Sequence, residues 1–275
     1  MIWRILKWTG ITLGVLLLMV VALAAYQVRF LWATPVFDTD IPADPGPVAA
    51  PAALIFSKTN GFRHASIEPG RAALTAALQA RGWTVVHTEK GSFFNEAFLS
   101  RFQVVVFLCT TGDILTQQQE AAFRAYILGG GGYAGIHSAA DTEHAWGWYD
   151  TLVGTHFRDH TLFPQLPEAV VVTEDTAHPA TSHLPPRWSR VDEWYNYKSN
   201  PRQRPGIRVL STLDESTYDP GTFGNMGGDH PITWVQELGA GRMFYTGMGH
   251  TPETFQDSLA MEMLLGGIRW AGRVE

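Results

Sequence analysis

Short apolar runs alternate with longer amphipathic segments from residue 52 to residue 153. The apolar runs predict buried strands at 53–57, 83–87, 103–108 and 133–136. The segments between and after them predict helices at 66–81, 95–100 and 145–153, and a further helix that begins at Asp113 or Thr116 and runs to the glycines at 129–132. Strands that alternate with helices are typical of a parallel sheet with right-handed crossovers, so this half predicts an α/β fold.

The second half is less regular and predicts more strands than helices. Apolar stretches predict strands at 169–173, 187–191, 206–213, 232–238 and 242–248. Residues 239–241 are Gly-Ala-Gly and favour a hairpin between the last two strands, which places antiparallel pairs in this half. A final helix is expected to begin at Thr251 or Glu253 and to end near Trp270. The pattern as a whole predicts a mostly parallel sheet with antiparallel strands in its second half.

The first 33 residues carry a different pattern. An uncharged apolar run from Trp8 to Val28 is long enough, at about 1.5 Å per residue, to cross the roughly 30 Å core of a bilayer. Arg4 and Lys7 precede this run, and basic residues favour the cytoplasmic side. We therefore predict a single-pass membrane anchor in residues 1–33, with the following domain on the non-cytoplasmic side. The alternative is export with cleavage of a signal peptide.

Residues 34–51 separate this anchor from the folded domain. Five prolines in this segment predict an extended, semi-rigid linker that holds the domain off the membrane surface. The domain itself is expected to cover residues 52–275.

Composition narrows the class of protein. The 275 residues are 45% hydrophobic and 17% charged, which is typical of a globular protein with a sizeable core. The net charge of −6 gives no basic surface for nucleic acid, so we expect no nucleic-acid partner. Cys109 is the only cysteine and follows an apolar run, so we expect a buried structural thiol and no disulfide.

Polar side chains follow the glycine-rich strand at 133–136. His137, Ser138 and Asp141 stand where that strand ends, and ligands of open parallel sheets bind outside the carboxyl ends of the strands. The alternative interpretation is a polar turn in which Ser138 or Asp141 caps the next helix.

Histidine is the most conspicuous candidate for chemistry. Seven histidines are expected in loops or at strand ends, and these are His64, His137, His156, His160, His178, His230 and His250. Imidazole transfers protons near neutral pH and is a common metal ligand. His156 and His160 are four residues apart and would share one face of a helix, so we assign them to a possible divalent metal site, such as zinc. Hydrogen-bonded loop histidines are the alternative.

Glu193 lies beside Trp194 and Tyr195 and is the best candidate for a general acid or base with an aromatic wall. A salt bridge with Arg190 or Arg158 is the alternative role for this carboxylate.

Several motifs together resemble the ThuA-like (trehalose utilisation) family across about residues 52–271. They lie at 59–67, 132–138, 154–160, 178–179, 192–195, 230–234 and 241–250. The resemblance implies the fold of class I glutamine amidotransferases, a flavodoxin-like sheet with helices on both faces. Those relatives carry a cysteine at the sharp turn after a strand, where this chain has His137. Glutamine hydrolysis is therefore not expected, because it needs an activated thiolate at that turn.

The resemblance also implies a role in the use of trehalose and related disaccharides, through 3-keto sugars made by a partner sugar dehydrogenase. A keto group acidifies the neighbouring C–H bond, so a base and an electrophile suffice for elimination or isomerisation. We predict His64, His137 and Glu193 as catalytic residues. Substrate contacts are assigned to Asn60, Arg63, Ser138, Asp141, Tyr195 and His250. The alternative is a non-catalytic module, either a scaffold subunit or a carbohydrate binder that stacks Trp146, Trp148 and Trp194 on sugars.

Overall fold

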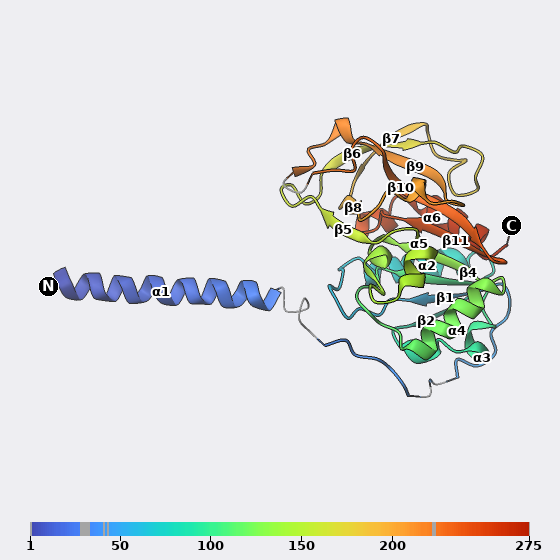
Figure 1. Ribbon diagram of the computed structural model, residues 1–275, viewed down its shortest axis with the longest axis horizontal. Helices are drawn as coiled ribbons and strands as arrows, with labels where there is room; N and C mark the ends of the chain where they lie inside the picture. The colour runs from blue at the N-terminus through green and yellow to red at the C-terminus, as the bar shows by residue number, and fades with distance from the viewer. Residues whose placement is uncertain (1, 28–33, 41, 43, 222–223, 275) are drawn as a thin grey trace.

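Nine strands form one sheet in the order β2-β1-β3-β4-β11-β10-β9-β6-β7 (Figure 1). This arrangement comes from a computed structural model that describes residues 2–27, 34–40, 42, 44–221 and 224–274. The parallel half of the sheet contains β1 (Ala52–Phe56), β2 (Thr84–Thr88), β3 (Val104–Leu108), β4 (Gly132–Ile136) and β11 (Gly241–Thr246). Its strands lie close to the predicted apolar runs.

The other half of the sheet is antiparallel. It contains β10 (His230–Leu238), β9 (Arg208–Asp214), β6 (Glu168–Thr173) and β7 (Arg187–Val191). The hairpin predicted at 239–241 joins β10 to β11. A separate two-stranded sheet, which the sequence pattern did not predict, pairs β5 (Phe157–His160) with β8 (Tyr195–Tyr197).

Helices cover both faces of the sheet. On one face Ala53 and Ile55 belong to the same buried cluster as residues of α2 (Ile67–Gln79) and α6 (Ser258–Ala271). On the other face Leu54 and Phe56 pack in the cluster that includes residues of α3, α4 and α5. The bounds of these three helices are Glu96–Leu99, Gln117–Leu128 and Gly147–Val153. Successive side chains of a strand point to opposite faces, so every β1 residue is buried.

The last helix begins later than expected. A short 3₁₀ turn at Pro252–Phe255 precedes α6, and Asp257 caps α6 by accepting the N–H of Ala260 at 2.8 Å. The prediction of a start at Thr251 or Glu253 therefore merged two elements, because the proline that opens the 3₁₀ turn is also typical of a helix start.

The predicted transmembrane anchor is wrong. The first helix, α1, covers Ile2–Gln27, and within the described part of the chain no helix has the length and apolar character needed to cross a membrane. Arg4 and Lys7 fall inside the first turns of α1 instead of preceding it. Val28, the expected end of the span, lies outside the described residues.

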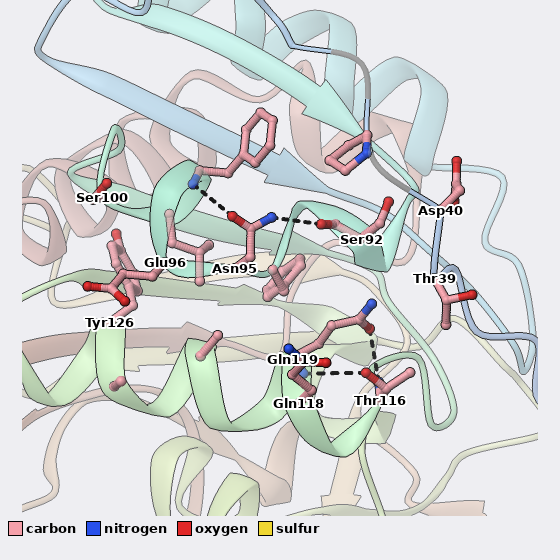
Figure 2. A pocket seen from close by; sticks show the side chains of 16 residues that line it. Thr39, Asp40, Ser92, Asn95, Glu96, Ser100, Thr116, Gln118, Gln119 and Tyr126 are labelled. Carbon is pink, nitrogen blue, oxygen red and sulfur yellow. Dashed lines mark hydrogen bonds between the residues drawn. The ribbon is translucent and has the colours of Figure 1, made fainter.

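The described residues of the proline-rich segment lie along the domain and form a strap, which we define as residues 34–51. The carboxylate of Asp38 in the strap lies 2.5 Å from Lys58 Nζ and accepts the N–H of Gly91 at 3.0 Å. The backbone carbonyl of Asp38 accepts the amide of Gln119 at 2.6 Å. A cavity of about 790 Å³ opens between the strap, α3 and α4 (Figure 2). Among the described residues that line this cavity there is no histidine and none of the predicted site residues.

Candidate functional site

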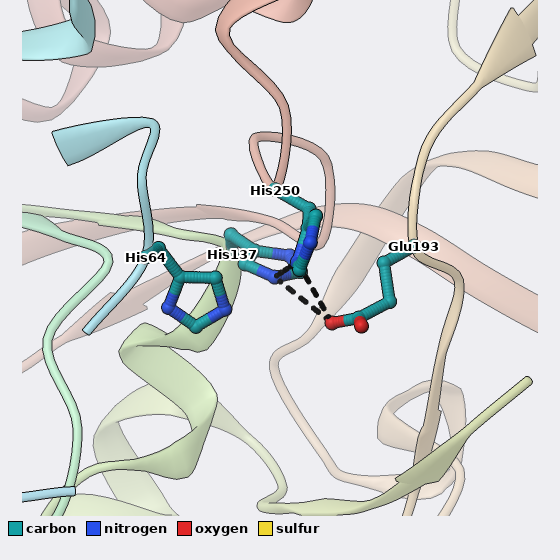
Figure 3. Close-up of side chains that lie close together, drawn as sticks. All are labelled: His64, His137, Glu193 and His250. Atoms are coloured by element: carbon teal, nitrogen blue, oxygen red, sulfur yellow. Dashed lines mark hydrogen bonds and ion pairs between the residues drawn. The ribbon is translucent and has the colours of Figure 1, made fainter. Parts of the chain in front are cut away.

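Four side chains from distant segments meet at the carboxyl edge of the parallel strands (Figure 3). His64 follows β1, His137 follows β4, His250 follows β11, and Glu193 precedes β8. One nitrogen or oxygen atom from each lies within 4.8 Å of those of the others. We call these four residues the histidine–glutamate cluster. Three of them were predicted as catalytic residues and His250 as a substrate contact.

His137 is the fully buried centre of the cluster. Its backbone φ of +53° is the left-handed conformation, which costs a non-glycine residue on the order of 1–3 kcal/mol and is found preferentially at functional sites. The ring Nδ1 lies 2.8 Å from the carbonyl oxygen of Gly247, so Nδ1 carries the proton and donates it. This bond leaves Nε2 directed at the cluster.

Glu193 connects two of the imidazoles. Its Oε2 lies 3.4 Å from His137 Nε2 and 3.0 Å from His250 Nδ1, and its side chain is only 3% exposed. Burial alone would raise the pKa of Glu193, but hydrogen bonds and charge at His137 and His250 outweigh it and hold the pKa below the usual range. Glu193 is therefore a carboxylate at neutral pH.

His64 closes the cluster on the side of β1. Its Nδ1 lies 3.2 Å from the hydroxyl of Ser138, and its ring is 4.7 Å from that of His137 and 5.0 Å from that of His250. Burial, followed by the charges of His137 and His250, lowers the pKa of His64 well below the usual histidine value. The neutral imidazole keeps a lone pair that can accept a proton or bind a metal.

Asp192 holds the cluster together from outside it. Its Oδ2 accepts the N–H of Gly249 at 2.9 Å and the hydroxyl of Thr254 at 2.8 Å. Its Oδ1 accepts the N–H groups of His250 at 3.0 Å and of Glu193 at 2.9 Å. This buried carboxylate therefore fixes the two loops that carry His250 and Glu193.

Two of the predicted substrate contacts border the cluster. Ser138 bonds His64 as described, and the ring of Tyr195 lies 4.2 Å from that of His137. Both side chains are buried. They position the imidazoles.

The structure assigns the other three predicted substrate contacts to interactions outside the cluster. Asn60 donates to the backbone carbonyls of Val36 and Asp113. Arg63 pairs with Glu68 and Glu89 at the surface. Asp141 lies 2.7 Å from His144 Nε2. These three side chains order the loops around the edge of the sheet.

The pair assigned to a metal, His156 and His160, does not converge. His160 is on β5 and His156 directly precedes that strand, and four residues span roughly 13 Å in a strand. His156 contacts the ring of His144 at 4.7 Å and the carbonyl of Ala140 at 3.3 Å. His160 Nδ1 lies 2.6 Å from the carbonyl of Thr161 and 3.4 Å from Glu193 Oε1. The helical spacing assumed for this pair does not occur, because His160 lies on a strand.

Two functional residues were missed by the sequence analysis. Gln165 donates its amide to Glu193 Oε1 at 2.7 Å, and Asp192 makes the four bonds given above. Asp192 lies next to Glu193 in the motif at 192–195, and this position could have pointed to it. Gln165 lies in a loop without any pattern that points to it.

Cys109 cannot supply the nucleophile of an amidotransferase in this arrangement. It is fully buried at the end of β3, and burial raises the pKa of its thiol to about 12. A thiol with this pKa is protonated at neutral pH, and only the thiolate attacks a carbonyl efficiently. The chemistry open to the site is therefore that of imidazole and carboxylate, in proton transfer or metal binding.

Comparison with known proteins gives the family. A family model described as ThuA, trehalose utilisation, matches residues 52–271. A ThuA-like protein from Bacteroides uniformis is 26% identical, with a TM-score of 0.70 over 84% of this chain and 95% of that chain. A ThuA-like protein from Parabacteroides merdae is 22% identical, with a TM-score of 0.62 over 82% and 90%.

More distant likeness concerns the fold alone. A cytoplasmic protein from Salmonella typhimurium is 11% identical, with a TM-score of 0.52 over 80% of this chain and 98% of that chain. The comparison with curated proteins finds no match. The family model agrees with the resemblance found in the motifs and covers most of the chain, so this protein belongs to the ThuA (trehalose utilisation) family.

Proposed function

We propose that this protein is an enzyme of carbohydrate metabolism that moves a proton at a carbon next to a keto group of a disaccharide such as a trehalose derivative. The observation that carries the proposal is the meeting of His64, His137, His250 and Glu193 at one point. The description of the family as trehalose utilisation supports the class of substrate. An enzyme needs at least two titratable groups within reach of one point, and this cluster has four.

The cluster contains the groups that such a reaction requires. A keto group acidifies the adjacent C–H bond, and a positioned base contributes about 10²–10⁴-fold to the rate of proton removal. His64 is suited to act as that base, because its lowered pKa keeps it neutral. Negative charge then develops on the keto oxygen and needs a hydrogen-bond donor or a cation. His250 is suited to this task, because its side chain is 17% exposed and can reach a bound sugar.

The keto sugar that serves as substrate would be made by a separate oxidation of the disaccharide. The carbonyl must be introduced by a dehydrogenase that removes two electrons and two protons from a sugar hydroxyl group. We therefore propose that a sugar dehydrogenase acts before this protein. Proton removal at the neighbouring carbon then leads either to elimination or to isomerisation.

The non-catalytic alternative depends on exposed tryptophan faces. Trp194 is 1% exposed and donates its indole N–H to the carbonyl of Pro167 at 2.9 Å. Trp146 and Trp148 pack against each other, with ring centroids 5.0 Å apart, and both are partly buried against the core. None of the three presents a free ring next to the histidine–glutamate cluster, so no observation favours the lectin-like function.

The proposal is tested with the full chain in D₂O. Trehalose and its 3-keto derivative are incubated with the protein, and NMR records deuterium incorporation at the carbon beside the carbonyl together with any product. We expect exchange with the keto sugar and none with trehalose. His64→Gln should lower the exchange rate at least about 100-fold. His183→Gln is the matched control and should leave the rate unchanged, because His183 is exposed and its Nε2 lies 3.0 Å from the Leu259 carbonyl, outside the cluster. Absence of exchange in the wild type, or an unchanged rate in His64→Gln, would contradict the proposal.

A further inference from the structure

The arrangement of lone pairs in the histidine–glutamate cluster needs a positive charge at its centre. His137 donates its Nδ1 proton to Gly247, so an uncharged His137 faces the cluster with the lone pair of Nε2. That lone pair is 3.4 Å from Glu193 Oε2, which is itself an acceptor, and 3.3 Å from His250 Nδ1. Two acceptors at this distance in a buried site repel each other strongly, because the local dielectric is low.

Protons are one source of this charge. A proton on His137 Nε2 would bond Glu193 Oε2, but it would make a fully buried imidazolium. A proton on His250 Nδ1 can form a good hydrogen bond with only one of its two neighbours. Glu193 Oε2, at 3.0 Å, is nearer than His137 Nε2, at 3.3 Å. The Nε2 atom of His137 would then still face the carboxylate without a proton. A metal ion accepts lone pairs from all four side chains at once, and their ligand atoms lie within 4.8 Å of one another.

The outer side of three of the four ligands, His137, His64 and Glu193, is held in the way that metal ligands usually are. His137 donates to the Gly247 carbonyl, His64 pairs with the Ser138 hydroxyl, and Glu193 Oε1 accepts the amide of Gln165. Hydrogen bonds of this kind fix the tautomer and orientation of a ligand before the ion arrives. The backbone of His250 is held by Asp192. The site is therefore oriented without any rearrangement of the fold.

We propose that His64, His137, His250 and Glu193 bind one divalent first-row transition metal ion. Three imidazole nitrogens and one carboxylate oxygen suit ions such as zinc, whereas magnesium and calcium prefer sites made only of oxygen. The inference deepens the proposed function and rests on it for the role of the ion. In the metal-bound protein His64 and His250 would be ligands, and the ion would take over their tasks, because it polarises the keto oxygen of the sugar and acidifies bound water that can serve as the base. Binding itself is measured without turnover, so the two proposals can fail separately.

The test uses the full chain freed of metal by a chelator and dialysis. Titration calorimetry with Zn²⁺ should give one equivalent per chain, and Co²⁺ should give visible d–d absorption bands of a nitrogen- and oxygen-bound ion. Glu193→Gln and His250→Ala should each weaken Zn²⁺ binding at least about 100-fold, since each removes a ligand. His183→Ala is the matched control and should bind like the wild type. Circular dichroism checks that each variant is folded.

Gln165→Ala is a second variant that leaves all four ligands in place. Loss of a hydrogen bond to a ligand usually costs about 10–100-fold in metal affinity, so an intermediate effect is expected. Saturating Zn²⁺ should also raise the unfolding temperature of the wild type and not that of His250→Ala.

The inference is overturned if the wild type binds well below one equivalent of Zn²⁺, or if Glu193→Gln and His250→Ala bind Zn²⁺ as tightly as the wild type. Turnover of the keto sugar at an undiminished rate in metal-free protein would overturn the role given to the ion and leave the proposed function standing. Metal binding without turnover of the keto sugar would support the metal site and contradict the proposed function.

Discussion

Asp192 Oδ1 accepts the backbone N–H of His250 at 3.0 Å, across 58 residues of sequence. The bond joins the loop after β11 to the segment between β7 and β8, and the same carboxylate also holds Glu193. Two members of the histidine–glutamate cluster thus depend on a single buried side chain that is not itself part of the cluster.

Replacing Asp192 by Asn should destabilise the protein by about 2–4 kcal/mol, because an amide NH₂ would face N–H and O–H donors in a fully buried position. Urea unfolding measures this loss. Asp40→Asn is the control, since Asp40 forms an exposed ion pair with Lys90 and should change the unfolding free energy very little. Equal stability of wild type and Asp192→Asn would show that the four bonds are not needed.

Gly249→Ala should disturb the cluster through the backbone. Gly249 has a φ of +127°, and an added Cβ would lie 2.8 Å from Ile136 Cγ2 and 3.4 Å from His137 Cβ. Strain and overlap together should cost at least about 2 kcal/mol, measured by urea unfolding. Gly147→Ala has no atom within 4 Å of the new Cβ and should be nearly neutral. A similar effect for both substitutions would contradict this account.

Glu143→Gln should change how stability depends on pH. Burial raises the pKa of Glu143 to about 8, although its Oε1 accepts the N–H groups of Ile114 and Leu115. The folded protein then holds a proton that the unfolded chain releases near pH 4.5, so this residue lowers stability as pH rises from about 4.5 to 8. The variant cannot titrate here, so its stability relative to the wild type should increase from pH 5 to pH 8 in urea unfolding. A constant difference between the two proteins over this range would refute the assignment.

Lys58→Met should release the strap from the domain. Lys58 Nζ lies 2.5 Å from Asp38 and is the cation that balances this partly buried carboxylate. Without it, residues 34–51 should exchange amide hydrogens faster and be cut sooner in limited proteolysis. Arg101→Met removes the exposed pair with Asp44 at 2.7 Å and should have a smaller effect, so it serves as the comparison. Unchanged exchange in Lys58→Met would mean that other contacts hold the strap.

Strands β1, β3 and β4 are buried on both faces and agree with the sequence prediction. Every residue of β1, β3 and β4 is buried, so each reads as a continuous apolar run. Strands β5 and β8 have only four and three residues, and polar residues within them interrupt any apolar run, so no local pattern distinguishes them from a loop. The short β5 also explains why His156 and His160 were treated as a helical pair.

The cluster was only partly predictable for a related reason. His64, His137 and His250 each follow a predicted apolar strand, and the carboxyl ends of parallel strands share one edge, so their approach follows from the topology. Glu193 and Gln165 reach the same point from irregular segments, and their positions depend on contacts between residues that are distant in sequence, such as those of Asp192. Propensity and periodicity are local quantities and do not encode such contacts.

The position of β11 has a consequence for how the protein is made. This strand is among the last elements of the chain, yet it lies in the middle of the sheet between β4 and β10. During synthesis one edge of β4 therefore has no partner until residues 241–246 have left the ribosome. Unpaired strand edges promote aggregation, so a nascent chain that stalls before this point is a substrate for chaperones.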